Sequence, residues 1–123
     1  MTVRAVHEWW AWVMIGANAV AGLWALGAHW LRALRVRSLW WFTTAAEVAV
    51  FVQVILGTYM VSAEKVPVPQ FHMFYGFVAI ISVAIIYSYR QQLEPRKYLL
   101  YGLGGLFIMG LGLRAIEVGN RPL

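Results

Sequence analysis

Four apolar runs, each long enough to cross a lipid bilayer as a helix, constrain this chain more than any other feature. They cover residues 9–31, 39–62, 71–89 and 98–118, and a spanning helix needs about 20 such residues. Because 62% of the residues are hydrophobic and only 12% are charged, a soluble core of this size could not bury the apolar surface. The sequence predicts an all-α, four-helix transmembrane bundle that forms a single integral membrane domain over residues 1–123, with the lipid bilayer as its main partner.

Basic residues between the runs predict the orientation. The loop after the first run and the loop after the third carry six of them: Arg32, Arg35, Arg37, Arg90, Arg96 and Lys97. The opposite side carries four: Arg4, Lys65, Arg114 and Arg121. Because cytoplasmic loops are enriched in Lys and Arg, we expect both termini to lie outside, in a bacterial inner membrane.

The charge and the cysteine count exclude several functions. The formal net charge of +5 fits loops that meet anionic headgroups, and the basic residues form no helix face that could follow nucleic acid. The chain has no cysteine, which excludes disulfides, iron–sulfur clusters and covalent c-type haem. No motif for hydrolysis or group transfer is visible, so we expect no catalytic residues and no independent enzymatic activity.

The first and third runs resemble one another. Residues 7–15 align with residues 72–80, so that His7 matches His72, three aromatic residues match three, and Val and Ile recur in place. The second and fourth runs agree more loosely. The pattern predicts a tandem duplication of a two-helix hairpin, with a pseudo-two-fold axis along the membrane normal.

The two matched histidines are the strongest candidates for a site. At about 100° per residue, the face of His7 carries small and polar residues (Ala11, Met14, Asn18, Ala21, Gly22, Ala25 and His29), and small residues mark contacts between membrane helices. His72 shares a face with Gly76, Ala79 and Val83. Both imidazoles should therefore point into the bundle at one depth. This suits axial ligation of a haem b iron; a lone metal ion, a quinone pocket and interfacial hydrogen bonding remain alternatives.

The remaining intramembrane polar residues suggest secondary roles. Glu47 is costly inside a membrane, and we expect it to relay protons, to bind a partner subunit or to form a hydrogen bond across helices. Its nearest cation is expected to be His29 or Arg90, and it shares a face with Thr43, Thr44 and Thr58. Gln53 lies on another face of the same run, which suggests contact with a further chain. His29 has no counterpart in the third run, so we expect a hydrogen bond between helices there.

The fourth run adds a charged pair and many glycines. Arg114 and Glu117 are three residues apart and should form an ion pair. Because Arg114 lies at the same side as the matched histidines, it is also a candidate to bind a haem propionate or a lipid phosphate. The glycines predict close helix packing; they are Gly102, Gly104, Gly105, Gly110 and Gly112.

Paired hairpins with histidines in register, together with the Gln-Val-Ile-Leu-Gly run at residues 53–57, resemble half of the haem A synthase fold and, more loosely, small four-helix membrane b-type cytochromes. The resemblance implies that His7 and His72 are an axial pair. The chain departs from the first family because its histidines open the first and third helices rather than lying on the second and fourth. No acidic residue of the outer loops matches that family's catalytic one.

Two functions follow from these patterns. We expect a haem-b-binding electron-transfer protein or an accessory subunit of a respiratory-type membrane complex. The alternative is a cofactor-free structural or assembly subunit that packs against other membrane subunits or forms a homo-oligomer. A transporter is a third choice, which the small size and the absence of interrupted helices disfavour.

Overall fold

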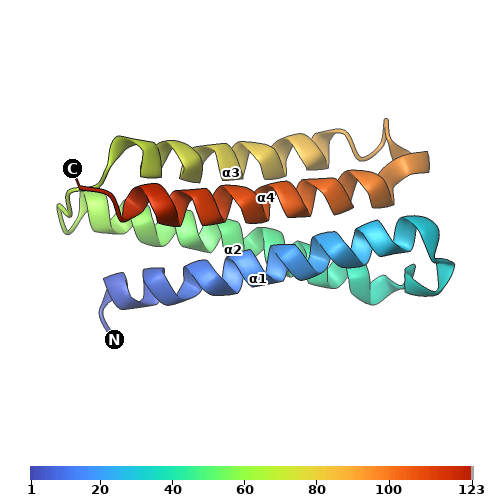
Figure 1. The fold of residues 1–123 in the computed structure, drawn as a ribbon, viewed down its shortest axis with the longest axis horizontal. Coiled ribbons are helices and arrows are strands. Elements are labelled where there is room, and N and C mark those ends of the chain that lie inside the picture. The colour runs from blue at the N-terminus through green and yellow to red at the C-terminus, as the bar shows by residue number, and fades with distance from the viewer. Residues whose placement is uncertain (123) are drawn as a thin grey trace.

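The computed structural model describes residues 1–122 and confirms an all-α, four-helix bundle (Figure 1). The two termini lie at the same end of the bundle, which is called the terminal end below. All four long helices are long and apolar enough to cross a membrane. The elements in chain order are α1 (Val3–Trp30), the short helix η1 (Arg32–Leu34), α2 (Arg37–Ser62), α3 (Gln70–Ser88), the short helix η2 (Glu94–Arg96) and α4 (Lys97–Gly119).

Helix α1 begins well before the apolar run that predicts it. Thr2 caps the helix, because its hydroxyl accepts a hydrogen bond from the Ala5 amide at 3.1 Å, which satisfies one of the free amides of the first turn. Arg4 and Glu8 then pair on the surface of that turn. The helical conformation therefore continues into the polar flank, and His7 lies within α1.

Helices α1 and α4 form the most extensive contact in the bundle. Helix α1 also packs along α2, and α4 also packs along α3, whereas α2 and α3 touch only sparsely. Helices α1 and α3 are therefore diagonal, as an up-and-down bundle requires. The bundle is closed on three sides and loosely packed on the side between α2 and α3.

Glycines allow α1 and α4 to cross with their backbones in contact. A Cβ atom on Gly22 would lie 2.8 Å from the Leu106 amide nitrogen, and one on Gly105 would lie 2.9 Å from the Gly22 Cα atom. Such distances leave no room for a side chain on either helix. The prediction of close packing is therefore confirmed at Gly102 and Gly105, and also at Gly104 and Gly112, where a Cβ atom would collide with side chains of α3 and α1, respectively. A Cβ atom on Gly110 would meet nothing within 4 Å.

Polar side chains join α1 to α2 within the apolar bundle. The Trp10 indole donates to the Ala49 carbonyl at 2.9 Å, and the buried Asn18 amide donates to the Ala46 carbonyl at 3.2 Å. Because lipid offers these groups no partner, a bond between helices satisfies them at the point of contact. These two bonds position the first hairpin.

The outer surface of the bundle is apolar. Large hydrophobic side chains on every helix are more than half exposed, among them Trp12, Leu23, Ile55, Phe77 and Phe107. A contiguous apolar surface of this extent needs lipid around it. The chain is an integral membrane protein.

Candidate functional site

A cavity opens at the terminal end, on the side where α2 and α3 diverge. Its volume is about 560 Å³, and residues of all four long helices and of the connection between α2 and α3 line it. This volume lies within the range of about 300–1,000 Å³ that ligand and cofactor pockets occupy. Both matched histidines are among the lining residues.

The two histidine rings meet across this cavity. The ring centroids of His7 and His72 are 6.1 Å apart, and the ring planes are inclined by 78°. One ring comes from α1 and the other from the diagonal helix α3. The structure thus brings together the two residues that the repeat pairs, at one level of the bundle.

His72 is held by its ring. Its Nδ1 atom lies 2.7 Å from the Ala115 carbonyl oxygen of α4. Because a carbonyl oxygen only accepts, Nδ1 carries the proton and Nε2 keeps the lone pair that a metal ion would bind. Gly119 makes this arrangement possible, since a Cβ atom there would lie 2.6 Å from Nδ1.

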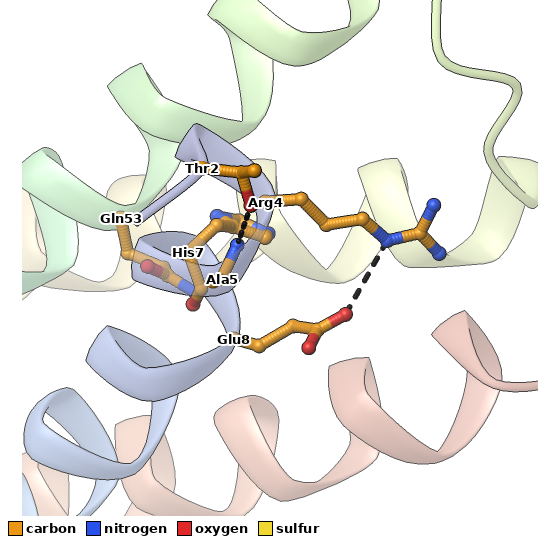
Figure 2. Close-up of polar contacts among 6 residues, drawn as sticks. All are labelled: Thr2, Arg4, Ala5, His7, Glu8 and Gln53. Carbon is orange, nitrogen blue, oxygen red and sulfur yellow. Dashed lines mark hydrogen bonds and ion pairs between the residues drawn. The ribbon is translucent and has the colours of Figure 1, made fainter.

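His7 is held by its backbone instead. The Gln53 side-chain amide donates to the His7 carbonyl oxygen at 2.8 Å, and Figure 2 shows this amide beside the main chain of α1. The His7 Nδ1 atom is buried and has no hydrogen-bond partner among residues 1–122. The ring lies against Gly57 of α2, where a Cβ atom would approach Cε1 to 3.1 Å.

Small residues leave space next to the imidazoles. A Cβ atom on Gly76 would meet nothing within 4 Å, and apolar side chains of α1 and α3, including Trp12, Met73 and Phe77, stand around the cavity. This surface is mainly apolar, which suits a flat organic group. The glycines and alanines that line it are Ala11, Gly57, Gly76, Ala79, Gly112, Ala115 and Gly119.

The charged residues nearby differ from the expectation. Arg114 forms the expected ion pair with Glu117 at 2.6 Å, but it is not one of the residues that line the cavity. Arg4 lines the cavity instead and pairs with Glu8 at 3.3 Å (Figure 2). Sequence reasoning missed Arg4, although its position one turn before His7 in a continuous helix was a signal that could have identified it.

Glu47 is half-buried and lies apart from this cavity. It has no hydrogen bond or ion pair within residues 1–122. Of the three threonines expected beside it, only Thr43 is buried, and its hydroxyl has no hydrogen-bond partner within residues 1–122. Thr44 and Thr58 are exposed, and the Thr44 hydroxyl donates to the Trp40 carbonyl of its own helix. The guanidinium of Arg90 stacks on Tyr87 rather than pairing with Glu47.

The other two polar candidates also have defined places. Gln53 binds the His7 carbonyl, so its face of α2 meets α1 rather than a further chain. His29 lies near the opposite end of α1, where its ring is edge-on to that of Trp30 with the ring centroids 4.8 Å apart. It is the His29 carbonyl, not the ring, that takes part in a tertiary hydrogen bond, accepting from Arg35 at 2.9 Å.

Comparison with known proteins adds no relative. No protein-family model matches the chain, and neither the curated proteins nor the solved structures contain a significant match. The resemblance to haem A synthase and to b-type cytochromes therefore stays a prediction. The geometry of the cavity and its histidines is the basis for a function.

Proposed function

We propose that this chain binds haem b between His7 and His72 and serves as an electron-transfer protein, or as an accessory subunit of a respiratory-type complex in the bacterial inner membrane. The observation that carries the proposal is the 6.1 Å separation of two imidazoles that face one cavity from diagonal helices. By the orientation predicted above, the site lies near the outer surface of the membrane.

The separation of the rings fits ligation from opposite sides of a metal. A metal–imidazole bond is about 2 Å long, so two opposed ligating nitrogens lie about 4 Å apart. Each ring centroid lies about 1 Å beyond its nitrogen, given ring bonds of about 1.3 Å. The resulting distance of about 6 Å between centroids is close to the distance between His7 and His72.

The donor set favours a macrocycle over a bare metal ion. Within residues 1–122 no group of three or more His, Asp or Glu side chains is placed to hold a metal. Haem would bring its remaining metal ligands itself, so His7 and His72 would suffice to hold it. The small residues of the cavity fit such a group between the two rings.

Haem held by His7 and His72 would supply a reversible one-electron change at iron, the chemistry that electron transfer needs. The chain contributes the rest. Ala115 fixes the tautomer of His72, the apolar walls restrict water and lower the local dielectric, and the ion pair of Arg4 and Glu8 lies at the cavity. The guanidinium of Arg4 favours the reduced, less positive state of the iron, and the carboxylate of Glu8 opposes it.

An absorption spectrum tests the proposal. The protein purified in detergent from haem-replete cells should be red, with a Soret band that shifts and sharpens when dithionite reduces it. The double variant His7→Ala/His72→Ala should lose the band. His29→Ala is the matched control and should keep it, because His29 lies at the other end of α1. A colourless wild-type protein, or a band that survives in the double variant, contradicts the proposal.

Glu47 favours a second candidate, a cofactor-free structural or assembly subunit. An intramembrane carboxyl group without a partner among residues 1–122 is costly, and a polar group on another subunit or on a second copy would satisfy it. In that case the colourless protein co-purifies with other membrane chains or as an oligomer, and Glu47→Leu disrupts the association. An association that Glu47→Leu leaves unchanged contradicts this candidate.

A further inference from the structure

The two histidines of the proposed haem site are equivalent in the repeat but are held differently. In the second hairpin, a hydrogen bond from α4 fixes the ring of His72 through Nδ1. In the first hairpin, the hydrogen bond from Gln53 holds only the main chain of His7, and the ring has no hydrogen bond to residues 1–122. The His7 ring can therefore turn without breaking a bond, whereas the His72 ring cannot.

This difference changes the strength of each imidazole as a ligand. A histidine that donates its second ring proton to a carbonyl is oriented for the metal and becomes a more basic ligand. His72 has such a partner, at 2.7 Å. The buried Nδ1 of His7 lacks one, so His7 is the weaker donor and the less firmly oriented ring.

We infer that His72 is the permanent axial ligand and His7 the exchangeable one, so that the reduced haem binds a diatomic gas on the His7 side. This inference rests on the proposed function, because it needs haem between the two rings. The exchange breaks one iron–nitrogen bond to His7 and forms one bond from iron to the gas, with no net transfer of electrons. The released imidazole stays neutral.

The cavity has room for this exchange. It extends over Ala11 and Gly57 on the side of His7 and opens between the sparsely packed helices α2 and α3. A small apolar gas dissolves in the lipid that surrounds this opening. A glycine lies against each ring, but the backbone of α4 comes closer to His72, since a Cβ atom on Gly119 would lie 2.6 Å from Nδ1 and one on Gly57 would lie 3.1 Å from Cε1 of His7.

Carbon monoxide is the probe. The wild-type protein is purified with its haem, reduced with dithionite in the absence of oxygen, and titrated with carbon monoxide while the Soret band is followed. We expect the band to shift to that of a carbon monoxide complex. This measurement needs no variant, so a folding defect cannot imitate or hide the result.

Two single variants identify the ligand that leaves. His7→Ala should retain haem with His72 as the one protein ligand, and free imidazole should restore a six-coordinate spectrum. Its carbon monoxide complex should have the same Soret position as that of the wild type, because His72 is opposite the gas in both. His72→Ala should lower the haem-to-protein ratio by about tenfold or more. Far-UV circular dichroism checks that both variants remain helical.

The outcomes separate the two ideas. A wild-type protein without a Soret band defeats the proposed function itself. A haem-containing protein whose reduced spectrum does not respond to carbon monoxide leaves the haem site intact and overturns the exchangeable ligand. Equal haem loss in both single variants overturns it as well, and so does a stronger loss in His7→Ala than in His72→Ala.

Discussion

The two helical hairpins offer the same histidine from the same position, but each holds it in its own way. In α1–α2 the glycine that touches the histidine is Gly57, and in α3–α4 it is Gly119. The first hairpin fixes the backbone of its histidine, and the second fixes the ring. The duplication that the sequence predicts accounts for two imidazoles at one level, and the different contacts made by the second helix of each hairpin make the two histidines unequal.

A substitution where α1 crosses α4, which is the contact between the two hairpins, should have the largest effect on stability. Gly22→Ala places a Cβ atom 2.8 Å from the backbone of α4, so α1 and α4 must separate. We expect a loss of about 1–3 kcal/mol in the free energy of unfolding, measured by thermal or denaturant unfolding in detergent. Because the two histidines sit on opposite sides of this joint, haem content should fall as well.

Gly16→Ala is the matched control for that variant. It lies on the same helix, and its Cβ atom would meet nothing within 4 Å. It should not lower stability, because alanine is the better helix former by about 1 kcal/mol. Equal destabilisation by Gly16→Ala and Gly22→Ala would show that the α1–α4 crossing does not depend on close backbone contact.

The glycines behind the histidines should give the next largest effect, and an unequal one. Gly119→Ala brings a Cβ atom to 2.6 Å from His72 Nδ1 and must break the bond to Ala115, at a cost of about 1–2 kcal/mol. Gly57→Ala approaches the His7 ring only to 3.1 Å, and no hydrogen bond prevents that ring from turning. Haem content and thermal stability should therefore fall further in Gly119→Ala. The reverse order would contradict the assignment of His72 as the anchored ring.

Removing the backbone tether of His7 should have a smaller effect. Gln53→Leu deletes the hydrogen bond to the His7 carbonyl and also removes the buried, unpartnered Oε1 atom of Gln53. The two changes oppose one another, so we expect a loss of at most about 1 kcal/mol. Hydrogen exchange should be faster in the first turns of α1 and unchanged in α3. Gln91→Leu, in the exposed loop between α3 and α4, is the control and should alter neither helix.

We expect the smallest effect from replacing the arginines near the site, and we expect it to differ between Arg4 of the first hairpin and Arg114 of the second. Arg4 lines the cavity, whereas Arg114 pairs with Glu117 outside its lining. Arg4→Ala should lower the midpoint potential of the bound haem, because it removes a positive charge that favours the reduced iron. Arg114→Ala should shift the potential less. A redox titration followed at the Soret band compares the two variants. A larger shift of the midpoint potential in Arg114→Ala would show that Arg114, and not Arg4, is the arginine that acts on the haem.

Much of the fold could be predicted because the bilayer imposes local requirements. A run such as residues 39–62 must be apolar along its whole length and helical throughout, whatever it packs against. The inward face of α1 could be predicted for the same reason, since Ala11, Asn18 and Ala25 are small or polar where lipid-facing positions are large. The start of α1 could not, because Thr2 and the charged first turn extend the helix beyond the apolar run.

The details of the candidate site depended on residues distant in the sequence. The ring of His72 is held by a main-chain carbonyl of α4. Because any residue at position 115 has a carbonyl, the residue type there could not predict this hydrogen bond. Glu47 shows the same difficulty in another form. The helical period placed it with Thr43 and Thr44, but a shared face does not say whether another helix covers that face.

The sequence by itself determined the four crossings, the level at which the two histidines lie and the inward direction of His7. These follow from apolar length and helical phase, which are properties of one helix at a time. Only the tertiary structure decided that α2 and α3 diverge, that Gly22 and Gly105 bring two backbones together, and that one histidine ring is fixed while the other is free. These features depend on how separate helices pack. The physical reason is that packing is set by contacts between residues far apart in the chain, and a shift of about one ångström is enough to make or break such a contact.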